Sequence, residues 1–392
     1  MKLLLALMLL ITQWGGQTNE GRLEGTWSAA AEFTGEGDMP RTSLANTTLR
    51  QVIKVSRGGK KMSLRLSNEF SAQPLYIKTV YVADAKDSCD IITKTAKTLK
   101  FNGKKSVVIP AGGTVDSDLL PYSLQPLQRL SITICYAEKV PENMTSHRGS
   151  RTTSYIMRGC QGPKKAFQPI EKVDHWYNIC QLNLLNATNE PAEIVAVLGN
   201  SITDGRGSTT NAQNRWPDQM AEALQGQVGV LNLGIGGNCV IRGGISEPAL
   251  QRFDRDILGQ NGLTKLIIFQ GTNDIGTSAD TDADQVADAL IVAYQQLIRK
   301  AQEKGLTTYV ATITPFKGNG WYTPAHEKAR QKVNQWIRSN CPTGRLIDFD
   351  QLVRDPQDIE KLQAIYSDDW LHLNPKGYEV MGKYAANILK KQ

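Results

Sequence analysis

A serine at the end of an apolar run is the residue best placed to do chemistry in this sequence. Ser201 follows Gly199 and Asn200, which come directly after the apolar run 194–198. A strand that ends in such a turn presents the next side chain at the carboxyl edge of a sheet, where open α/β folds bind substrates. Ser201 is therefore the predicted nucleophile.

A nucleophilic serine needs a base within hydrogen-bond reach and a group that orients this base. His372 is the preferred base, because Asp369 precedes it by three residues in a loop before a predicted helix. This spacing allows the carboxylate to meet one ring nitrogen while the other nitrogen faces Ser201. The neighbouring Asp368 remains an alternative to Asp369 as the orienting acid.

The other three histidines, His147, His175 and His326, are competing bases. None of them has a carboxylate at short spacing in a predicted strand-end loop. We interpret His326 as a residue on the surface of a helix. His372 therefore stays the first choice.

Acyl transfer by a serine also needs hydrogen-bond donors for the oxyanion that develops on the substrate. The turn 232–238 is rich in glycine, so its N–H groups can approach a ligand without obstruction by side chains. Gly237 is the predicted donor in this turn. Asn273 is predicted to add its side-chain amide, and Ser201 its own backbone N–H.

The second half of the chain alternates between apolar strands and amphipathic helices. Strands are expected at 194–198, 228–233, 266–269, 309–313 and 346–349, and helices at 283–304 and from Pro375 to about Lys390. Asn374 is expected to cap the last helix. Five parallel strands with helices on both faces predict a flavodoxin-like α/β/α layer sandwich.

The first half has short alternating runs broken by turn residues, which predicts a β-sandwich. The runs 51–56 and 62–67 flank a glycine turn at 57–60 and are expected to form two strands joined by this turn. A chain of 392 residues is long enough for two domains. We place a β-sandwich domain at 21–190 and a catalytic domain at 191–392.

The amino terminus has the pattern of a secretory signal. Met1 and Lys2 precede nine apolar residues, 3–11, a run that is too short to span a bilayer. We assign residues 1–20 to a signal peptide and expect a periplasmic or extracellular protein. No later apolar stretch is long enough to predict a transmembrane segment.

Six cysteines are spread along the chain without the close pairs of zinc sites, and no His-Glu-x-x-His pattern occurs, so neither a metal nor another cofactor is expected. Cys160 and Cys180 are the disulfide pair to test first. The connectivity stays open at this point, since free buried thiols fit the sequence equally well.

The net charge of +7 is unevenly distributed. Residues 22–190 contain 23 Lys and Arg against 15 Asp and Glu, whereas residues 191–392 contain 21 against 22. The excess could attract an acidic polymer such as a uronic-acid glycan. Our preferred interpretation is solvated strand edges, where lysines discourage aggregation. Nucleic acid is not an expected partner, because no known binding motif is present.

The four blocks around the predicted site resemble those of the SGNH hydrolases, the GDSL-like esterase family. Their Ser, Gly, Asn and His match Ser201, Gly237, Asn273 and His372 in order, with Asp369 in the last block. The resemblance implies the family's α/β/α fold for the second half and an esterase that uses no cofactor. One departure is Asn200, where the family has an Asp that supports the turn.

The first half is similar to the β-rich, jelly-roll-like amino-terminal domain of exported SGNH esterases found alongside polysaccharide-degrading enzymes. The likeness rests on segments 48–52, 64–70 and 74–77. It implies a partner substrate that is an acylated carbohydrate, such as acetylated plant cell-wall polysaccharide.

The expected function is removal of short acyl groups, mainly acetyl, through an acyl-enzyme intermediate. The alternatives are a lipase, arylesterase or thioesterase, or a non-catalytic glycan-binding protein. Four residues are candidates for contacts with the substrate: Arg206, Trp216, Trp321 and Trp370. The preferred interpretation is packing for the tryptophans and a surface salt bridge for Arg206. The oligomeric state stays open.

Overall fold

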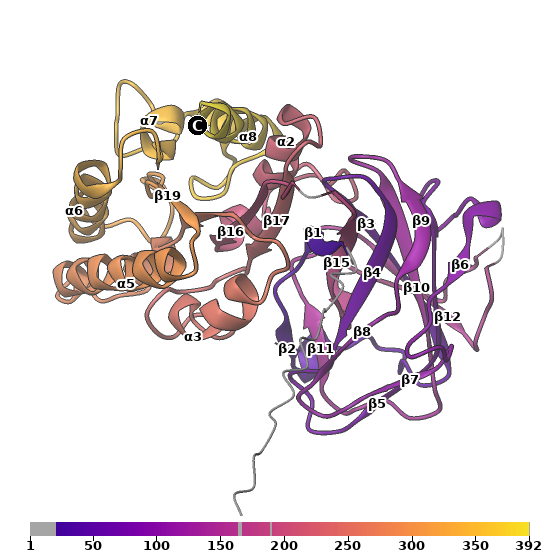
Figure 1. Cartoon of the computed structure of the whole chain (residues 1–392). Helices are drawn as coiled ribbons and strands as arrows, with labels where there is room; N and C mark the ends of the chain where they lie inside the picture. The colour runs from indigo at the N-terminus through magenta and orange to yellow at the C-terminus, as the bar shows by residue number, and fades with distance from the viewer. Residues whose placement is uncertain (1–20, 164–166, 189, 392) are drawn as a thin grey trace, which may run out of the picture.

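A computed structural model describes residues 21–163, 167–188 and 190–391 of the chain. The predicted signal peptide lies outside these residues. Within them, no helix has the length and hydropathy needed to cross a bilayer. The chain forms a β-rich half and an α/β half that lie side by side (Figure 1).

The β-rich half consists of three antiparallel sheets. One has the order β1-β15-β4-β8 with β9 on β4, the second β13-β12-β3-β10-β5-β6 with β7 on β5, and the third β14-β11-β2. The strands are β1 (Arg22–Ser28), β2 (Glu32–Thr34), β3 (Thr47–Lys54), β4 (Gly59–Ser67), β5 (Leu75–Asp84), β6 (Lys97–Thr98), β7 (Val107–Ile109), β8 (Thr114–Asp116), β9 (Leu120–Leu124), β10 (Arg129–Tyr136), β11 (Met144–His147), β12 (Ser154–Arg158), β13 (Glu171–Val173), β14 (Trp176–Tyr177) and β15 (Ile179–Asn186).

A single hydrophobic core holds side chains from the two larger sheets. Leu49 and Ile134 enter it from one sheet, and Leu64 and Leu182 from the other. Because successive side chains of a strand point to opposite faces, the alternating runs of the sequence place every second residue in this core. The predicted β-rich first half is confirmed.

The predicted hairpin at 57–60 is wrong. β3 pairs with β10 and β12, whereas β4 pairs with β15, β8 and β9, so the chain crosses from one sheet to the other at this turn. Contacts distant in sequence hold the crossing. Arg57 forms an ion pair with Glu24, and its N–H donates to Thr26. A Cβ at Gly58 would lie 2.5 Å from the carbonyl oxygen of Leu124.

The α/β half has a parallel sheet in the order β17-β16-β18-β19-β20. Its elements are β16 (Ile194–Gly199), α1 (Ser201–Asp204), α2 (Trp216–Ala223), β17 (Gly229–Gly234), α3 (Ala249–Phe253), β18 (Lys265–Phe269), α4 (Thr272–Gly276), α5 (Ala283–Glu303), β19 (Thr307–Ala311), α6 (Pro324–Asn340), β20 (Leu346–Ile347), α7 (Phe349–Val353) and α8 (Pro375–Lys390).

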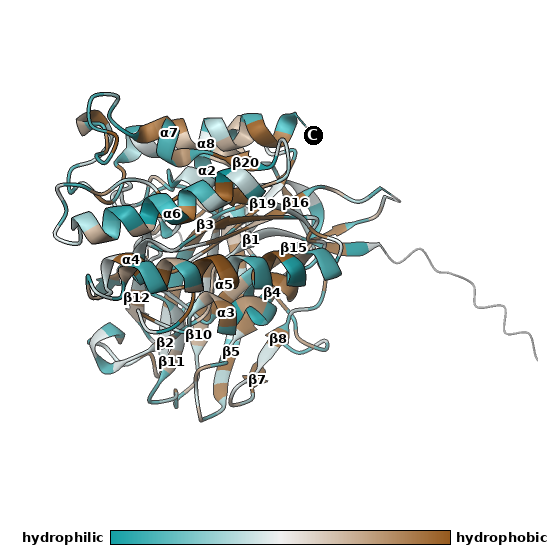
Figure 2. Ribbon diagram, turned by 90° about the vertical axis from the view of Figure 1, so that its left-hand side faces the viewer, coloured by the Kyte–Doolittle hydropathy of each residue, from teal (hydrophilic) through white to brown (hydrophobic). Residues whose placement is uncertain are grey.

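Alternate strand residues supply two cores, one on each face of this sheet. Ala196 and Leu198 pack with α3, α5 and α6. Val195 and Val197 pack with α2, α7 and α8. The mixed α/β second half is therefore confirmed, and the brown and teal surfaces of α5 follow the predicted amphipathic pattern (Figure 2). The side chain of Asn374 caps α8 as expected, by accepting from the N–H groups of Lys376 and Gly377.

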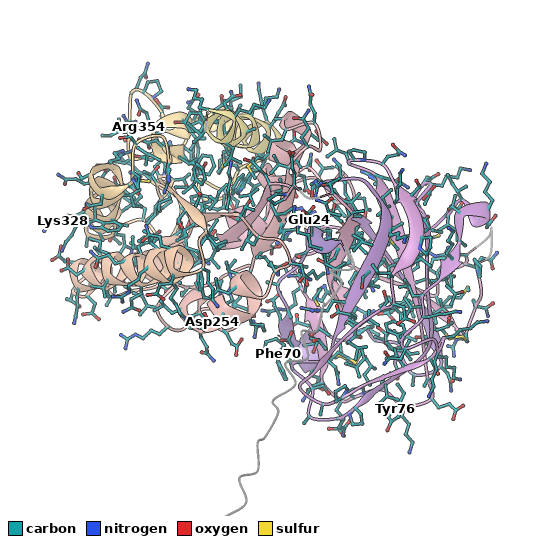
Figure 3. All side chains as sticks on the ribbon, viewed as in Figure 1. Glu24, Phe70, Tyr76, Asp254, Lys328 and Arg354 are labelled. Carbon is teal, nitrogen blue, oxygen red and sulfur yellow. A yellow bond between two sulfur atoms is a disulfide. The ribbon has the colours of Figure 1, made fainter. Side chains whose placement is uncertain are left out.

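Direct hydrogen bonds join the two halves. Gly25 of β1 donates to the carbonyl of Asn261, and the hydroxyl of Ser56 accepts from the N–H of Val230. Glu24 lies at this junction (Figure 3). Burial disfavours its ionised form, but bonds from Asn186, the N–H of Ala192 and two arginines lower its pKa to about 2. Specific polar contacts thus join the two halves at this junction, beside apolar ones such as Ala30 in a core of the α/β half.

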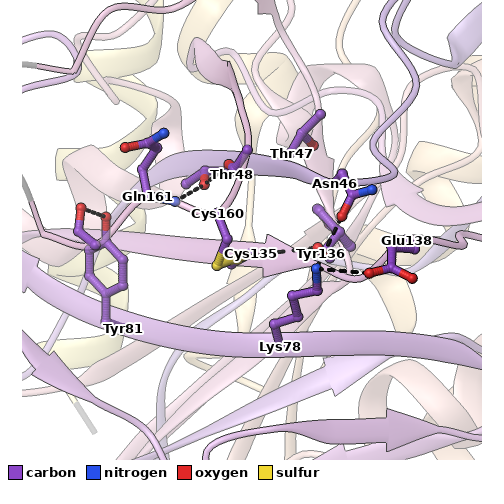
Figure 4. The surroundings of a disulfide bond; sticks show 12 residues. Asn46, Thr47, Thr48, Lys78, Tyr81, Cys135, Tyr136, Glu138, Cys160 and Gln161 are labelled. Carbon is purple, nitrogen blue, oxygen red and sulfur yellow. Dashed lines mark hydrogen bonds and ion pairs between the residues drawn. A yellow bond between two sulfur atoms is a disulfide. The ribbon is translucent and has the colours of Figure 1, made fainter.

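The disulfide joins Cys135 to Cys160, with a Cα separation of 5.2 Å (Figure 4). The favoured pairing of Cys160 with Cys180 is wrong. Cys135 is the last residue but one of β10 and Cys160 follows β12, and both strands flank β3 in one sheet. Cys180 lies on β15 in the other large sheet and forms no disulfide.

Candidate active site

A cavity of about 530 Å³ opens beyond the carboxyl ends of β16, β17 and β18, and both halves of the chain line it. Ser201, Gly237, Asn273, Asp369 and His372, which the sequence singled out from four separate segments, all contribute to its wall. Parallel strands end at one edge of a sheet, and this topology brings the segments together.

Ser201, His372 and Asp369 form a hydrogen-bonded series. Ser201 Oγ lies 2.9 Å from His372 Nε2, and His372 Nδ1 lies 2.7 Å from Asp369 Oδ2. The other carboxylate oxygen of Asp369 accepts the N–H groups of Leu371 and His372. Asp368 is exposed and does not contact the ring. This arrangement allows a neutral imidazole to accept the proton of a serine hydroxyl.

The pKa values of this series favour a neutral ring and an ionised carboxylate. Burial lowers the pKa of His372, the charges of Arg206 and Arg151 lower it further, and Asp369 offsets only part of this effect. Burial opposes ionisation of Asp369, but its hydrogen bonds with His372 and Leu371 lower its pKa. At neutral pH His372 is therefore ready to act as an acceptor.

The turn that carries Ser201 is tightly packed. The side-chain oxygen of Asn200 accepts the N–H of Ile202 at 3.0 Å and so caps α1. An amide oxygen serves this capping role as an Asp carboxylate would, so the departure at Asn200 preserves the turn. A Cβ at Gly199 would lie 2.1 Å from Thr203 Oγ1. The N–H of Ser201 begins the helix and has no acceptor within it.

The glycine turn offers a second N–H. Gly237 has φ +69°, which favours glycine, and a Cβ there would lie 2.8 Å from Ile245. Among the described residues no group accepts its N–H. Asn273 Nδ2 donates to the carbonyl of Asn238 at 2.7 Å, and the carboxylate of Asp274 accepts the N–H of Val240 at 2.9 Å. These bonds from α4 fix the turn and orient the Asn273 amide.

Two buried residues that the sequence analysis missed hold the strand ends. Arg252 donates to the carbonyls of Gly199 and Leu233 and pairs with Asp256, and Gln270 Nε2 donates to Gly199 at 2.9 Å. The arginine and aspartate four residues apart are the signal that could have predicted this cluster. These contacts position the backbone on both sides of the nucleophile turn.

The β-rich half contacts α1 through His147. Its Nε2 lies 3.0 Å from Asp204 Oδ1, and its Nδ1 lies 3.0 Å from the carbonyl of Ala30. Burial lowers the pKa of His147, but the charges of Asp204 and Glu32 outweigh this and raise it overall. Both ring nitrogens are engaged, so this rival base is not available to Ser201.

His326, predicted on a helix surface, is buried, because its ring bonds the carbonyls of Trp321 and Ser278. That prediction is wrong.

Of the four candidate substrate contacts, two line the cavity and two do not. Arg206 and Trp321 line the cavity. Trp216 is fully buried against Phe269 and Phe349, so its prediction as a substrate contact is wrong. Trp370 does not line the cavity, since its ring packs under Lys361 at 4.0 Å. The sequence placed both tryptophans near the right loops but could not show which way each ring points.

Residues 197–380 match the model of the GDSL-like lipase/acylhydrolase family. This region is a GDSL-like acylhydrolase domain. The protein is therefore an enzyme that hydrolyses carboxylic ester bonds. No curated protein matches the chain.

Solved structures resemble the acylhydrolase half at low identity. A GDSL-like lipase from Bacteroides thetaiotaomicron is 19% identical, with 51% of this chain and 89% of that chain covered and a TM-score of 0.40. A carbohydrate acetylesterase family member from Sinorhizobium meliloti is 13% identical, with 51% and 98% covered and a TM-score of 0.41. An acetyl xylan esterase is 21% identical, with 50% and 98% covered and a TM-score of 0.36.

Proposed function

We propose that this acylhydrolase is an exported serine esterase that removes short acyl groups, chiefly acetyl, from carbohydrate. The observation that carries the proposal is the hydrogen-bonded series of Ser201, His372 and Asp369 at the wall of a polar cavity. Export rests on the signal-like sequence of residues 1–20.

In the proposed mechanism Ser201 Oγ attacks the ester carbonyl while His372 Nε2 takes its proton. Asp369 holds the proton of His372 on Nδ1 and stabilises the imidazolium. The N–H groups of Ser201 and Gly237 and the amide of Asn273 stabilise the oxyanion. His372 then gives its proton to the leaving sugar oxygen, and a water molecule hydrolyses the acyl-enzyme by the same route.

The cavity favours a short acyl group and a polar alcohol. Its large apolar side chains are only Ile245, Trp321 and Leu371. Most of its other side chains are charged or polar: Glu32, Asp38, Arg148, Arg151, Ser201, Asp204, Arg206, Asn273, Asn319, Asp369 and His372. A long acyl chain gains binding energy by packing against large apolar side chains, and only these three stand in the described wall. Trp321 could stack on a sugar ring.

The test is release of acetate from native acetylated glycans by wild type and by Ser201→Ala. We expect acetate from wild type alone. Comparing the rates of hydrolysis of acetyl and octanoyl chromogenic esters distinguishes the proposed esterase from a lipase. Faster hydrolysis of the octanoyl ester would contradict the proposal. If Ser201→Ala binds the glycan as well as wild type does, and wild type does not hydrolyse it, the non-catalytic alternative would be favoured.

The acid limb of the pH profile should report the ionisation of His372. A protonated ring cannot accept the Ser201 proton, so kcat/KM is lost below the pKa of His372 and kept above it. Because this pKa is lowered, we expect the midpoint below about 6.5, the ordinary value for histidine. Arg206→Gln removes a charge that lowers this pKa and should move the midpoint to higher pH at low ionic strength. Arg158→Gln, at an exposed position remote from the cavity, is the control.

Replacement of Asn273 by alanine should lower kcat by about 10² to 10³, the usual loss for one oxyanion donor. The loss should appear in kcat more than in KM, because the oxyanion exists only in the transition state. Steady-state kinetics with an acetyl ester measures this, and urea unfolding reports whether the Asn238 contact also matters for stability. Turnover near that of wild type would remove Asn273 from the mechanism.

A further inference from the structure

Two arginines from opposite halves of the chain line the cavity beside the nucleophile. Arg151 lies in the loop between β11 and β12, and Arg206 follows α1. Both are close enough to lower the pKa of His372 by their charge. No mechanistic step proposed above uses either guanidinium.

The backbone of each arginine is held firmly. The N–H of Arg206 donates to the carbonyl of Ser201 at 2.9 Å, and its own carbonyl accepts the hydroxyl of the buried Tyr378. Arg151 has φ +49°, an uncommon backbone conformation for a residue other than glycine, and its carbonyl accepts the N–H of Asn211 at 2.9 Å. The β-rich half thus anchors the backbone of one cationic residue of the cavity, and the α/β half anchors the other.

The guanidinium groups themselves lack strong partners. Among the described residues, Arg206 has no side-chain hydrogen bond or ion pair. Arg151 reaches only Asp204 Oδ2, at 3.8 Å, and its Nε is buried without a hydrogen-bond partner. A planar guanidinium with free donors is suited to a carboxylate, which it can bind through two parallel hydrogen bonds.

Arg148, the third arginine of the cavity, shows the contrast. Its side chain bonds Glu32 at 2.6 Å and Ser246 at 3.0 Å, and it lies 3.5 Å from Asp38. The remaining acidic groups have partners as well, since Asp204 contacts His147 and Asp369 contacts His372. Within the described residues, Arg151 and Arg206 are therefore the arginines of this cavity whose guanidinium N–H groups remain free to bind a ligand.

We propose that Arg151 and Arg206 bind a carboxylate of the substrate, so that the esterase acts on acyl groups carried by uronic-acid residues. This inference rests on the proposed function and specifies its substrate class. The excess of Lys and Arg over Asp and Glu in residues 22–190 would also attract a polyanionic glycan at long range. A neutral sugar would leave Arg206 without a charged partner among the described residues and Arg151 with Asp204 alone, at 3.8 Å.

The test compares a matched pair of substrates: an O-acetylated methyl galacturonoside and the equivalent galactoside, in which CH₂OH replaces the carboxylate. The measured quantity is the ratio of their kcat/KM values for acetate release. For wild type we expect the ratio to favour the anion by about tenfold or more, the size of one charge-assisted hydrogen bond. Added salt should reduce this preference.

Arg206→Gln should reduce the ratio towards one. Any change in the basicity of His372 affects both substrates equally and cancels in the ratio. Arg206→Lys, which keeps the charge, should retain more of the preference, and Arg158→Gln should keep the wild-type ratio. Arg151→Gln should reduce the ratio in the same way. If the Arg151 variant does not fold, the variants of Arg206 still test the inference, because this side chain is exposed.

A wild-type ratio near one would overturn this inference while leaving the esterase activity in place. A ratio unchanged by Arg206→Gln would also overturn the role of Arg206. Hydrolysis of p-nitrophenyl acetate without acetate from either glycoside would reject a carbohydrate substrate and this inference together. Failure to hydrolyse all three esters would reject the proposed function itself.

Discussion

Ser201→Ala is expected to lower kcat by about 10⁶-fold, the loss seen when a serine hydrolase loses its nucleophile. The hydroxyl is the proposed attacking group, and within the described part of the chain its only hydrogen bond to a side chain is with His372. Steady-state hydrolysis of a chromogenic acetyl ester measures the loss. Removing one oxygen leaves no cavity of consequence in the packed turn, so thermal unfolding should stay close to that of wild type.

A covalent label gives an independent readout of the same residue. A fluorophosphonate should modify wild type at Ser201, as located by peptide mass spectrometry, and should leave Ser201→Ala unmodified. Activity within tenfold of wild type, or labelling of another serine, would assign the nucleophile elsewhere.

Asp369→Asn should lower kcat by about 10⁴-fold with little change in fold. Asparagine keeps the shape and one acceptor oxygen, so the bonds from the N–H groups of Leu371 and His372 can persist. The amide NH₂ that replaces Oδ2 donates a hydrogen bond to Nδ1 where the carboxylate accepts one, so the ring would carry its proton on Nε2 and could not accept from Ser201.

Asp368→Asn is the matched control for this experiment. It makes the same chemical change one residue earlier, at an exposed carboxylate without contact to the ring. Its kcat should stay within about twofold of wild type, as for a surface substitution. Equal losses in the two variants would point to an effect of the loop and not to orientation of His372.

The sequence alone predicted the positions of the parallel strands and of the helices α5 and α8 closely, but gave no bounds for the other helices of this half. Buried parallel strands must be apolar along their whole length, and α5 and α8 carry their packing faces at helical spacing. The segment of Asn374 and Pro375 contains its own start signal, which depends on no distant contact. Such local patterns can be read from one sequence.

Pairings between segments distant in the sequence could not be predicted as well. The turn at 57–60 has the composition of a hairpin, yet contacts of Arg57 with Glu24 and Thr26 hold it as a crossing to another sheet. The Cys135–Cys160 disulfide depends on which strands flank β3. The alternation of apolar and polar residues predicts a strand but not its neighbours in the sheet. The orientations of Trp216 and Trp370 were likewise decided by packing.

The sequence by itself determined which residue types are available for chemistry. Each of Ser201, Gly237, Asn273 and His372 lies next to the end of its own strand or the start of its own helix, and that position can be read from the local segment. Only the tertiary structure decided that the β-rich half lines the cavity, with His147 on Asp204 and with Arg151 in the same cavity as Arg206. The physical reason is that these contacts join segments more than 50 residues apart, so they form only once folding has brought those segments together.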